Sequence, residues 1–206
     1  MLPLSKNRPQ TLDLYWRGPF SWPAIKTNRD LTTLENSHHA LSCGVYLWAV
    51  EYLDKYLIYA AGQTLRRFIT RFFEHTKAHK EGFFTVFDME EMKQGKRKEI
   101  WHGFFTRKHP VEKVQEFKER YEEIQEAIAV QLATFRVFVA PMEPDTRLLK
   151  RTESAIMNIL YNSPPPASEI PDRGMSLSGR WENEEPVLVR NVGNYNFHGL
   201  PEEFEI

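Results

Sequence analysis

Two apolar runs joined by a short polar stretch constrain the fold of this chain more than any other feature. The run CGVYLWAVE, residues 43–51, is continuous, β-branched and aromatic, and it has the length of a buried strand. The run YLIYAAG, residues 56–62, begins only a few residues later, so the two runs predict a β-hairpin. We expect Gly62 to end the second strand and Thr64 to cap a helix that continues to about Lys80.

The remaining pattern predicts further strands and helices around this hairpin. Strands are expected at 82–92, 100–105 and 135–142, and helices at about 110–132 and 143–162. This order of elements predicts an α/β (α+β) fold, in which helices flank a small antiparallel or mixed sheet.

The segments outside the hairpin and its helices contain many breakers of regular structure. We predict a single domain, residues 1–206, with a loop-rich N-terminal arm (1–40, including a short helix at about 30–37), a core (41–162, with an insertion at 81–132) and an irregular C-terminal extension (163–206).

Composition limits the kinds of protein that this chain could be. Its 206 residues, 41% of them apolar, suffice for one good core. No apolar run approaches the length of a membrane span, and residues 1–20 lack the layout of a signal peptide. The single cysteine, Cys43, excludes an internal disulfide and a cysteine-based zinc site. We therefore expect a cytoplasmic protein with no membrane partner.

Charge is unevenly distributed along the chain, although the formal net charge is only −1. Between Arg66 and Lys80 there are five Lys and Arg residues against one Glu. From Glu182 onwards there are six Glu residues against Arg190. The acidic end therefore masks basic regions upstream, and any case for a nucleic-acid partner rests on local charge.

The helix predicted after Gly62 carries two stripes of side chains. Its apolar face comprises Leu65, Phe68, Ile69 and Phe72. Arg67, Arg71 and His75 recur every fourth position on a second stripe. A guanidinium can hold two phosphate oxygens, and an imidazole one turn away can exchange a proton near neutral pH. The stripe is compatible with phosphodiester chemistry, but taken alone the pattern favours a solvated basic face.

The helix at 143–162 places one carboxylate beside its buried stripe. On a helical wheel Glu153 lies next to Leu149 and Leu160, at the margin of the apolar face. A half-buried carboxylate in that place could ligate a hard cation such as Mg²⁺. The alternative is a surface pair between Glu153 and Lys150.

Together these pieces resemble the GIY-YIG nuclease family over about residues 43–162. The matching positions are Gly44-Val45-Tyr46 in the first signature strand, Gly62 and Thr64 of YAAGQT in the second, Arg71 and His75 one helical turn apart, and Glu153 in ESAIMNIL. The resemblance implies a GIY-YIG-like core and a Mg²⁺-dependent endonuclease that hydrolyses phosphodiester bonds.

The resemblance also implies a role for each matching side chain. Glu153 would hold one Mg²⁺ per site, and Arg71 would neutralise charge on the transition state. Tyr46 would orient or deprotonate the attacking water, or His75 would accept its proton, and these two alternatives remain open. Tyr59 would share the contact with the water or the phosphate.

Two positions depart from the family pattern. Counting back from Gly62, the second signature tyrosine falls on Ala60, and Tyr59 stands one position earlier. One extra residue in the strand, as in a β-bulge, would return Tyr59 to the site. Asn162 is the nearest candidate for the asparagine that often follows the family's catalytic helix, and it would otherwise cap the end of that helix.

The family relationship suggests DNA, most simply double-stranded DNA, as the partner. We predict that Arg67, the 93–108 segment with Lys96, Arg97 and Lys98, and the N-terminal arm contact DNA, although the basic segment would also suit a solvated hairpin tip. A restriction or defence role fits a chain without an evident appended domain, and a homodimer would suit cutting of both strands.

Two other functions remain open at this stage. A GIY-YIG-like module that binds nucleic acid with weakened or lost catalysis is suggested by Ala60. A protein without a nucleic-acid partner is suggested by the near-neutral charge.

Overall fold

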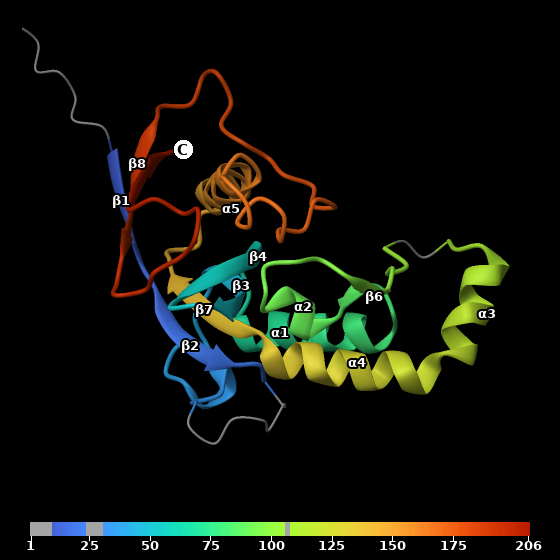
Figure 1. Ribbon diagram of the computed structural model, residues 1–206. Coiled ribbons are helices and arrows are strands. Elements are labelled where there is room, and N and C mark those ends of the chain that lie inside the picture. The colour runs from blue at the N-terminus through green and yellow to red at the C-terminus, as the bar shows by residue number, and fades with distance from the viewer. Residues whose placement is uncertain (1–9, 24–30, 106–107) are drawn as a thin grey trace, which may run out of the picture.

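A four-stranded antiparallel sheet forms the centre of the computed structural model, which describes residues 10–23, 31–105 and 108–206 (Figure 1). Its strands stand in the order β2-β7-β3-β4. Their bounds are Arg17–Ser21 for β2, Gly44–Tyr52 for β3, Lys55–Thr64 for β4 and Arg136–Pro141 for β7. The predicted hairpin is β3 and β4, and the predicted strand at 135–142 is β7.

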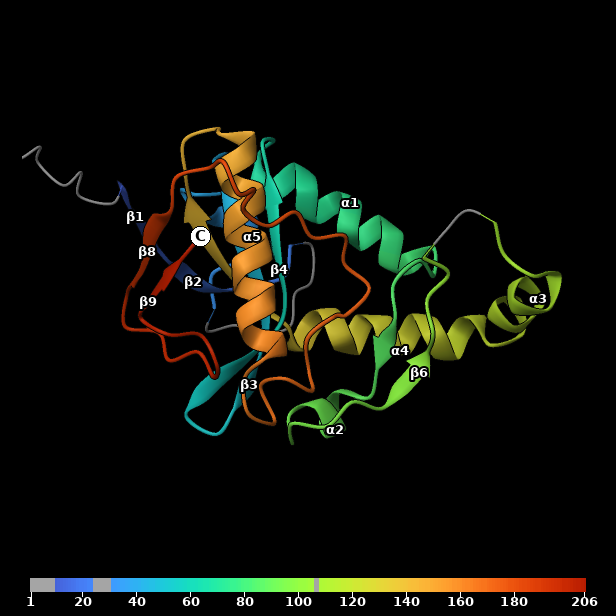
Figure 2. The same ribbon diagram turned by 90° about the horizontal axis from the view of Figure 1, so that it is seen from above.

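Helices cover both faces of this sheet, which confirms the predicted α+β class. Helices α1 (Phe68–Lys80) and α4 (Tyr121–Thr134) lie on one face, and α5 (Thr146–Tyr161) lies on the other (Figures 1 and 2). Side chains of β3 alternate between two buried clusters, as a strand requires. Tyr46 and Trp48 belong to the first cluster, and Val45 and Leu47 to the second.

Both the predicted loop-rich arm and the predicted irregular extension contain strands, while most of residues 163–206 form neither helix nor strand. A second sheet combines β1 (Gln10–Tyr15), β8 (Val187–Val192) and β9 (Glu203–Glu205), with β1 parallel to β8. Its short strands bury Leu14 and Val189 against the cluster beneath α5. Because β1 and β8 lie near opposite ends of the sequence, local pattern did not reveal their pairing.

The N-terminal region also contains one turn of 3₁₀ helix, Leu34–Asn36, within the predicted helix at 30–37. Residues 1–9 and 24–30 lie outside the described part of the chain.

The insertion between α1 and α4 forms a small substructure with its own two-stranded sheet. Strand β5 (Val86–Phe87) is far shorter than the strand predicted at 82–92, and it pairs with β6 (Glu99–Trp101). Helix α2 (Met89–Met92) replaces the end of that predicted strand. The Asp88 carboxylate accepts hydrogen bonds from the backbone N–H groups of Glu90 and Glu91 and so starts the helix.

The predicted long helix at 110–132 is interrupted. Helix α3 (Val111–Glu119) ends where Arg120 leaves helical geometry, with φ −100° and ψ 16°, and α4 begins at Tyr121. The Arg120 guanidinium donates to Glu116, Glu123 and the carbonyl oxygen of Ile100. These contacts stabilise the bend, and α3 projects away from the sheet (Figures 1 and 2).

Helix α1 begins later than predicted. Thr64 still pairs with Gly44 in the sheet, and its hydroxyl accepts a hydrogen bond from the backbone N–H of Arg66. The first helical N–H groups are satisfied by the backbone, because Phe68 donates to the carbonyl of Ser42 and Ile69 to that of Ala40. Thr64 is therefore the end of a strand, and the predicted N-cap was wrong.

Candidate active site

The Tyr46 ring lies directly across the backbone of Gly62. The two residues pair in the β3–β4 ladder, and a Cβ built on Gly62 would come within 2.4 Å of the Tyr46 hydroxyl oxygen. Only glycine leaves that space free. The absent side chain therefore lets the phenol reach over β4, which is the last strand in the order of the sheet.

Tyr46 meets two side chains of α1 at this place. Its hydroxyl is 2.8 Å from Nε2 of His75, and Nε of Arg71 donates to the same oxygen at 3.4 Å. Because Arg71 has only protons to offer, the tyrosine proton is free to point at His75. That arrangement assigns the acceptor role to Nε2 of His75 and places its proton on Nδ1.

Burial sets the protonation of this pair. Tyr46 and His75 are 3% and 5% exposed, respectively. Desolvation raises the pKa of Tyr46 to about 12, against the opposing effect of Arg71. Desolvation, together with the charge of Arg71, holds the pKa of His75 well below its ordinary value. At neutral pH the site therefore contains a protonated tyrosine and a neutral imidazole that can accept its proton.

Helix α5 brings acceptors to the outer edge of β4. The backbone N–H of Ala61 donates to Sδ of Met157 at 3.1 Å, and the backbone N–H of Gln63 bonds to the Glu153 carboxylate. Ala61 and Gln63 present their N–H groups on the same edge, and Glu153 and Met157 are one helical turn apart. The edge strand thus positions Glu153 beside Gly62, although α5 covers the opposite face of the sheet from α1.

Glu153 is half-buried at this edge, as its place beside the apolar stripe predicted. Desolvation raises its pKa to about 7, while the Gln63 N–H and the charges of Arg71 and Lys150 act in the opposite direction. Glu153 in turn contributes to the pKa of Tyr46. The structure therefore brings together four of the predicted residues, Tyr46, Arg71, His75 and Glu153, from β3, α1 and α5.

A magnesium site at this edge would have few protein ligands. Within residues 10–23, 31–105 and 108–206, no group of three or more His, Cys, Asp and Glu side chains is arranged to hold a metal ion. Mg²⁺ is commonly bound by one or two carboxylates, with water and substrate phosphate completing its shell. The Glu153 carboxylate, in its ionised form, is a ligand of the type that this mode of binding uses.

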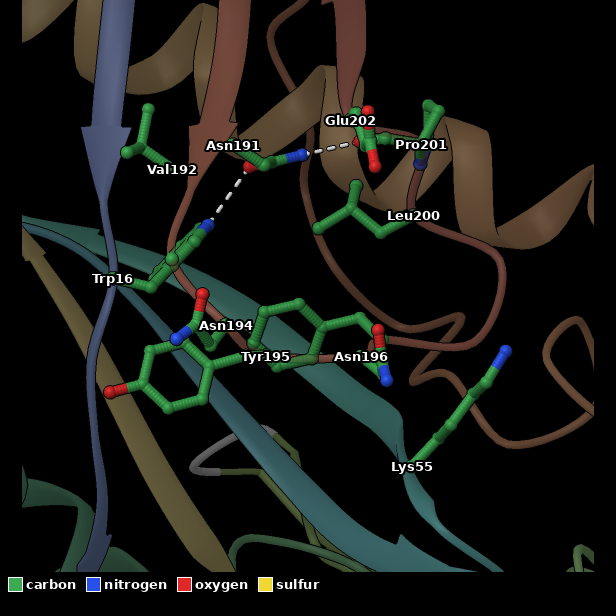
Figure 3. Close-up of a pocket in the computed structure, with 12 residues that line it drawn as sticks. Trp16, Lys55, Asn191, Val192, Asn194, Tyr195, Asn196, Leu200, Pro201 and Glu202 are labelled. Carbon is green, nitrogen blue, oxygen red and sulfur yellow. Dashed lines mark hydrogen bonds between the residues drawn. The ribbon is translucent and has the colours of Figure 1, made fainter.

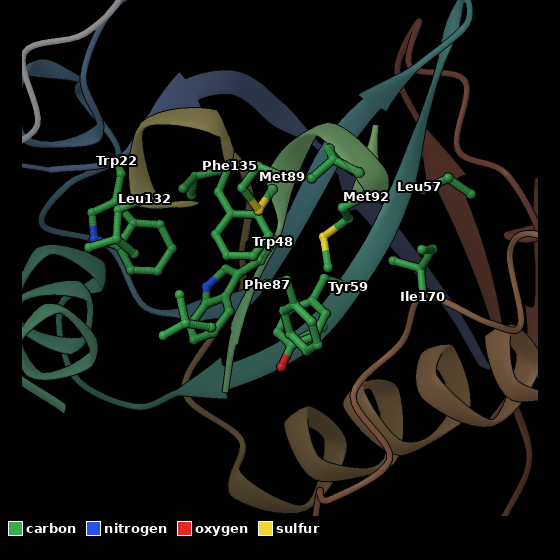
Figure 4. Packing of buried hydrophobic residues seen from close by; sticks show 14 of the residues in the cluster. Trp22, Trp48, Leu57, Tyr59, Phe87, Met89, Met92, Leu132, Phe135 and Ile170 are labelled. Carbon is green, nitrogen blue, oxygen red and sulfur yellow. The ribbon is translucent and has the colours of Figure 1, made fainter. Parts of the chain in front are cut away.

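Tyr59 occupies the β-bulge that its departure from the family pattern suggested. Trp48 pairs with Ala60 and Ala49 pairs with Ile58, so Tyr59 is the extra residue. Its ring joins the same buried cluster as Tyr46, but it stacks on Trp48 and Phe135 at centroid distances of 6.3 and 5.6 Å (Figure 4).

The Trp48 indole stacks on both tyrosines and separates them. Burial raises the pKa of Tyr59 strongly. Tyr59 is thus placed in the core and away from Arg71 and Glu153, which gives its predicted contact with water or phosphate no geometric support.

Two further predicted residues lie outside this group. The Asn162 side chain donates to the carbonyl oxygen of Asn158 at 2.7 Å and caps α5, which is the alternative that the sequence left open. Arg67 is exposed at the start of α1, where it lines a surface hollow of about 780 Å³ together with Asp13, Glu143 and Asp145. The mixed charge of that hollow gives no preference for a polyanion.

The predicted DNA-contacting side chains of the 93–108 segment are engaged within the protein. Lys96 pairs with Glu91 at 4.0 Å, and Lys98 with Asp88 at 3.0 Å. Arg97 donates to the carbonyl oxygen of Pro171 at 2.9 Å, and its guanidinium lies 4.8 Å from the centre of the Phe87 ring. Arg97 therefore packs the segment after α5 against β5. Residues 106–107 of the segment lie outside the described residues.

A cavity of about 340 Å³ lies at the other end of β4, beside Lys55 (Figure 3). The indole N–H of Trp16 donates to the Asn191 side chain at 2.9 Å, and Asn191 donates to the carbonyl oxygen of Pro201 at 2.6 Å. None of the predicted site residues lines it.

Sequence reasoning missed two charged neighbours of Arg71. Glu74 accepts hydrogen bonds from both Arg66 and Arg71. Their spacing in LRRFITRFFEH carries a signal for the Arg71–Glu74 pair, because residues three apart on a helix are neighbours. The link to Arg66 has no such signal, since Arg66 precedes the first turn of α1.

In comparisons with known proteins, no family model, curated protein or solved structure matches this chain. In the described part of the chain, no helix is both long and apolar enough to cross a membrane.

Proposed function

We propose that this chain is a Mg²⁺-dependent DNA endonuclease of the GIY-YIG type. The observation that carries the proposal is the convergence of Tyr46, Arg71, His75 and Glu153 at one edge of the sheet. These side chains come from three separate elements, yet they supply a proton acceptor, a fixed cation and a metal-binding carboxylate. Metal-dependent phosphodiester hydrolysis can use all three.

The hydrogen bonds suggest how the attacking water loses its proton. Its proton would pass to the Tyr46 oxygen as the phenol proton passes to Nε2 of His75, and the resulting hydroxide would attack phosphorus. His75 would become a cation in a buried place beside Arg71, which is costly on its own. The negative charge of a bound phosphodiester would offset that cost. Tyr46 and His75 would therefore act together, as successive proton carriers.

Arg71 and Glu153 would act on the phosphate. The Arg71 side chain is 35% exposed, so it can reach a substrate while Nε stays on Tyr46. Glu153 would hold Mg²⁺, which supplies charge stabilisation for the scissile phosphate and the leaving oxygen. Double-stranded DNA as substrate, a restriction role and a homodimer rest on the family resemblance alone.

One observation favours a second function, in which the protein binds nucleic acid without cutting it efficiently. The family's second tyrosine has no counterpart in the site, because Ala60 stands at its position and Tyr59 packs in the core. A site with one tyrosine would hold a phosphodiester through Arg71 but manage the water less well.

A plasmid assay distinguishes these functions. Supercoiled plasmid and phage DNA, methylated and unmethylated, would be incubated with the protein in Mg²⁺ or EDTA. We expect metal-dependent cutting that falls at least about a thousandfold in Glu153→Ala. Glu123→Ala, an exposed change on α4, is the matched control and should cut normally. DNA binding without cutting would support the second function, and absence of both would contradict the proposal.

A further inference from the structure

Glu74 lies between two arginines beside the candidate active site. Its carboxylate accepts a two-pronged hydrogen bond from the terminal nitrogens of Arg66, with 2.7 Å between Nη2 of Arg66 and Oε2 of Glu74. The same Oε2 atom accepts from Nη1 of Arg71 at 3.3 Å. One carboxylate therefore joins two guanidinium groups, one of which also bonds to Tyr46.

Arg66 and Arg71 therefore form an anion-binding site, and the Glu74 carboxylate of the same chain occupies it. Carboxylates and phosphates are both recognised by the paired N–H groups of a guanidinium, so a group that binds one in this geometry can bind the other. A phosphodiester that binds the edge of Arg71 facing Glu74 must displace the Glu74 carboxylate, because both groups would accept the same Nη1 proton.

The local charges allow that exchange. Slight burial acts to raise the pKa of Glu74, but hydrogen bonds from Arg66 and Arg71 outweigh it and lower the pKa, so the carboxylate is ionised at neutral pH. The side chains of Arg66, Arg71 and Glu74 are 57%, 35% and 40% exposed. Ion pairs this accessible to water are weak and are displaced readily by a competing anion.

We propose that Arg66 is a second phosphate-binding residue and that Glu74 occupies the phosphate position until substrate displaces it. This inference rests on the proposed function for its substrate, a nucleic-acid phosphodiester. Glu74 keeps the two guanidinium groups oriented in the free protein, and it makes weak anions poor competitors for the site. A polyanion brings its phosphate at high local concentration and overcomes this competition.

The test measures phosphate binding without any cleavage. Protein labelled with ¹⁵N at arginine would be titrated with dimethyl phosphate, a simple phosphodiester, and the Nε–H signals of Arg66 and Arg71 would be followed. Glu74→Gln keeps the shape of the side chain and removes its charge. Glu81→Gln is the matched control, because Glu81 pairs with Lys77 on the same helix at 3.7 Å. Both variants lose one exposed negative charge.

We expect Glu74→Gln to bind dimethyl phosphate about fivefold more tightly than the wild type, and Glu81→Gln to differ by less than about 1.5-fold. In the Glu74→Gln background, Arg66→Gln should reverse the gain, whereas Lys77→Gln should not. Equal affinities of Glu74→Gln and Glu81→Gln for dimethyl phosphate would overturn the role of Glu74. Equal affinities of the Arg66→Gln and Lys77→Gln variants in the Glu74→Gln background would overturn the role of Arg66.

A parallel titration with a short DNA duplex in EDTA keeps this inference separate from the proposed function. If the wild type fails to cut DNA but the arginine signals respond as expected, the anion site stands and the nuclease proposal fails. If the wild type cuts DNA and the Arg71 signal responds to the probes while the Arg66 signal responds to neither, the anion site fails and the nuclease proposal stands.

Discussion

Two regions of one sheet face each contain a buried tyrosine, but one tyrosine has polar neighbours and the other has aromatic ones. At one end, Tyr46 bonds to His75 and Arg71 and lies near Glu153. At the other, Tyr59 stacks against Trp48 and Phe135 (Figure 4). Both tyrosines are almost fully buried, at 3% and 4% exposure. The difference lies in their neighbours, since Tyr46 has a proton acceptor and a cation, whereas Tyr59 has aromatic rings.

The two histidines on α1 repeat this contrast one turn apart. Nε2 of His75 bonds to Tyr46, whereas neither ring nitrogen of His79 has a hydrogen-bond partner among the described residues. Burial lowers the pKa of His79 to about 3. The comparison teaches that residue type and burial do not define the site here. The site is defined by proximity to the edge of β4, where the charge of Arg71 acts on Glu153.

Among changes that repack the two regions, the largest effect is expected from filling the space above Gly62. Gly62→Ala places a methyl group 2.4 Å from the Tyr46 hydroxyl oxygen, so the ring must move. A displacement of about 1 Å in a catalytic group can reduce the rate of cutting about a hundredfold, and the crowding should cost about 1–3 kcal/mol of stability. Plasmid cutting and urea unfolding measure the two effects.

Gly179→Ala is the control for this change, because its added Cβ would meet only the Ser154 hydroxyl, at an ordinary 3.4 Å. Unchanged cutting by Gly62→Ala would show that the position of Tyr46 does not matter.

The next effect concerns stability and pH. The pKa of Glu153 is raised in the folded protein to about 7 from 4.5, so the ionised form is disfavoured by folding. The free-energy cost of ionising Glu153 in the folded protein is absent below pH 4.5, the unfolded pKa. This cost grows as the pH rises from 4.5 to about 7 and reaches its full value above pH 7. Glu153→Gln should therefore be about 2 kcal/mol more stable than the wild type at pH ~8, and no more stable near pH ~4.

Thermal unfolding at the two pH values measures this difference. Mg²⁺ should raise the melting temperature of the wild type at the higher pH and leave that of Glu153→Gln unchanged. A variant that is less stable than the wild type at both pH values would indicate a structural carboxylate instead of a metal-binding one.

The smallest effect is expected in the aromatic region. His79 is fully buried with both ring nitrogens unpaired, which is unfavourable. His79→Leu should stabilise the protein by about 1 kcal/mol and leave plasmid cutting within about twofold of the wild type. A large loss of cutting with normal stability would mean that the active region extends further along α1 than His75.

Local patterns were sufficient to predict the centre of the fold. The hairpin of β3 and β4 followed from two apolar runs, and the place of Glu153 beside Leu149 followed from helical periodicity. The strands at the two ends of the chain were not predictable in this way, because β1 and β8 pair across 177 positions between Asp13 and Arg190. Their stability comes from a contact that no local window contains.

Local pattern predicted only some of the site residues. Tyr46, Arg71, His75 and Glu153 stand at positions that a motif can specify. Tyr59 could not be placed by counting, because a bulge fixes which face a side chain takes but not which neighbours it meets. The neighbours of Tyr59 are Trp48 and Phe135. Trp48 belongs to β3, whereas Phe135 stands between α4 and β7, so their meeting with Tyr59 depends on the tertiary fold.

The most direct test of the account compares Tyr46→Phe with Tyr59→Phe in one plasmid-cutting assay with Mg²⁺. Each variant loses a single hydroxyl from a buried tyrosine on the same sheet face. The account predicts that Tyr46→Phe cuts at least about a hundredfold more slowly than the wild type. Tyr59→Phe should stay within about threefold of the wild type. Equal losses in the two variants, a larger loss in Tyr59→Phe, or no cutting by the wild type would contradict it.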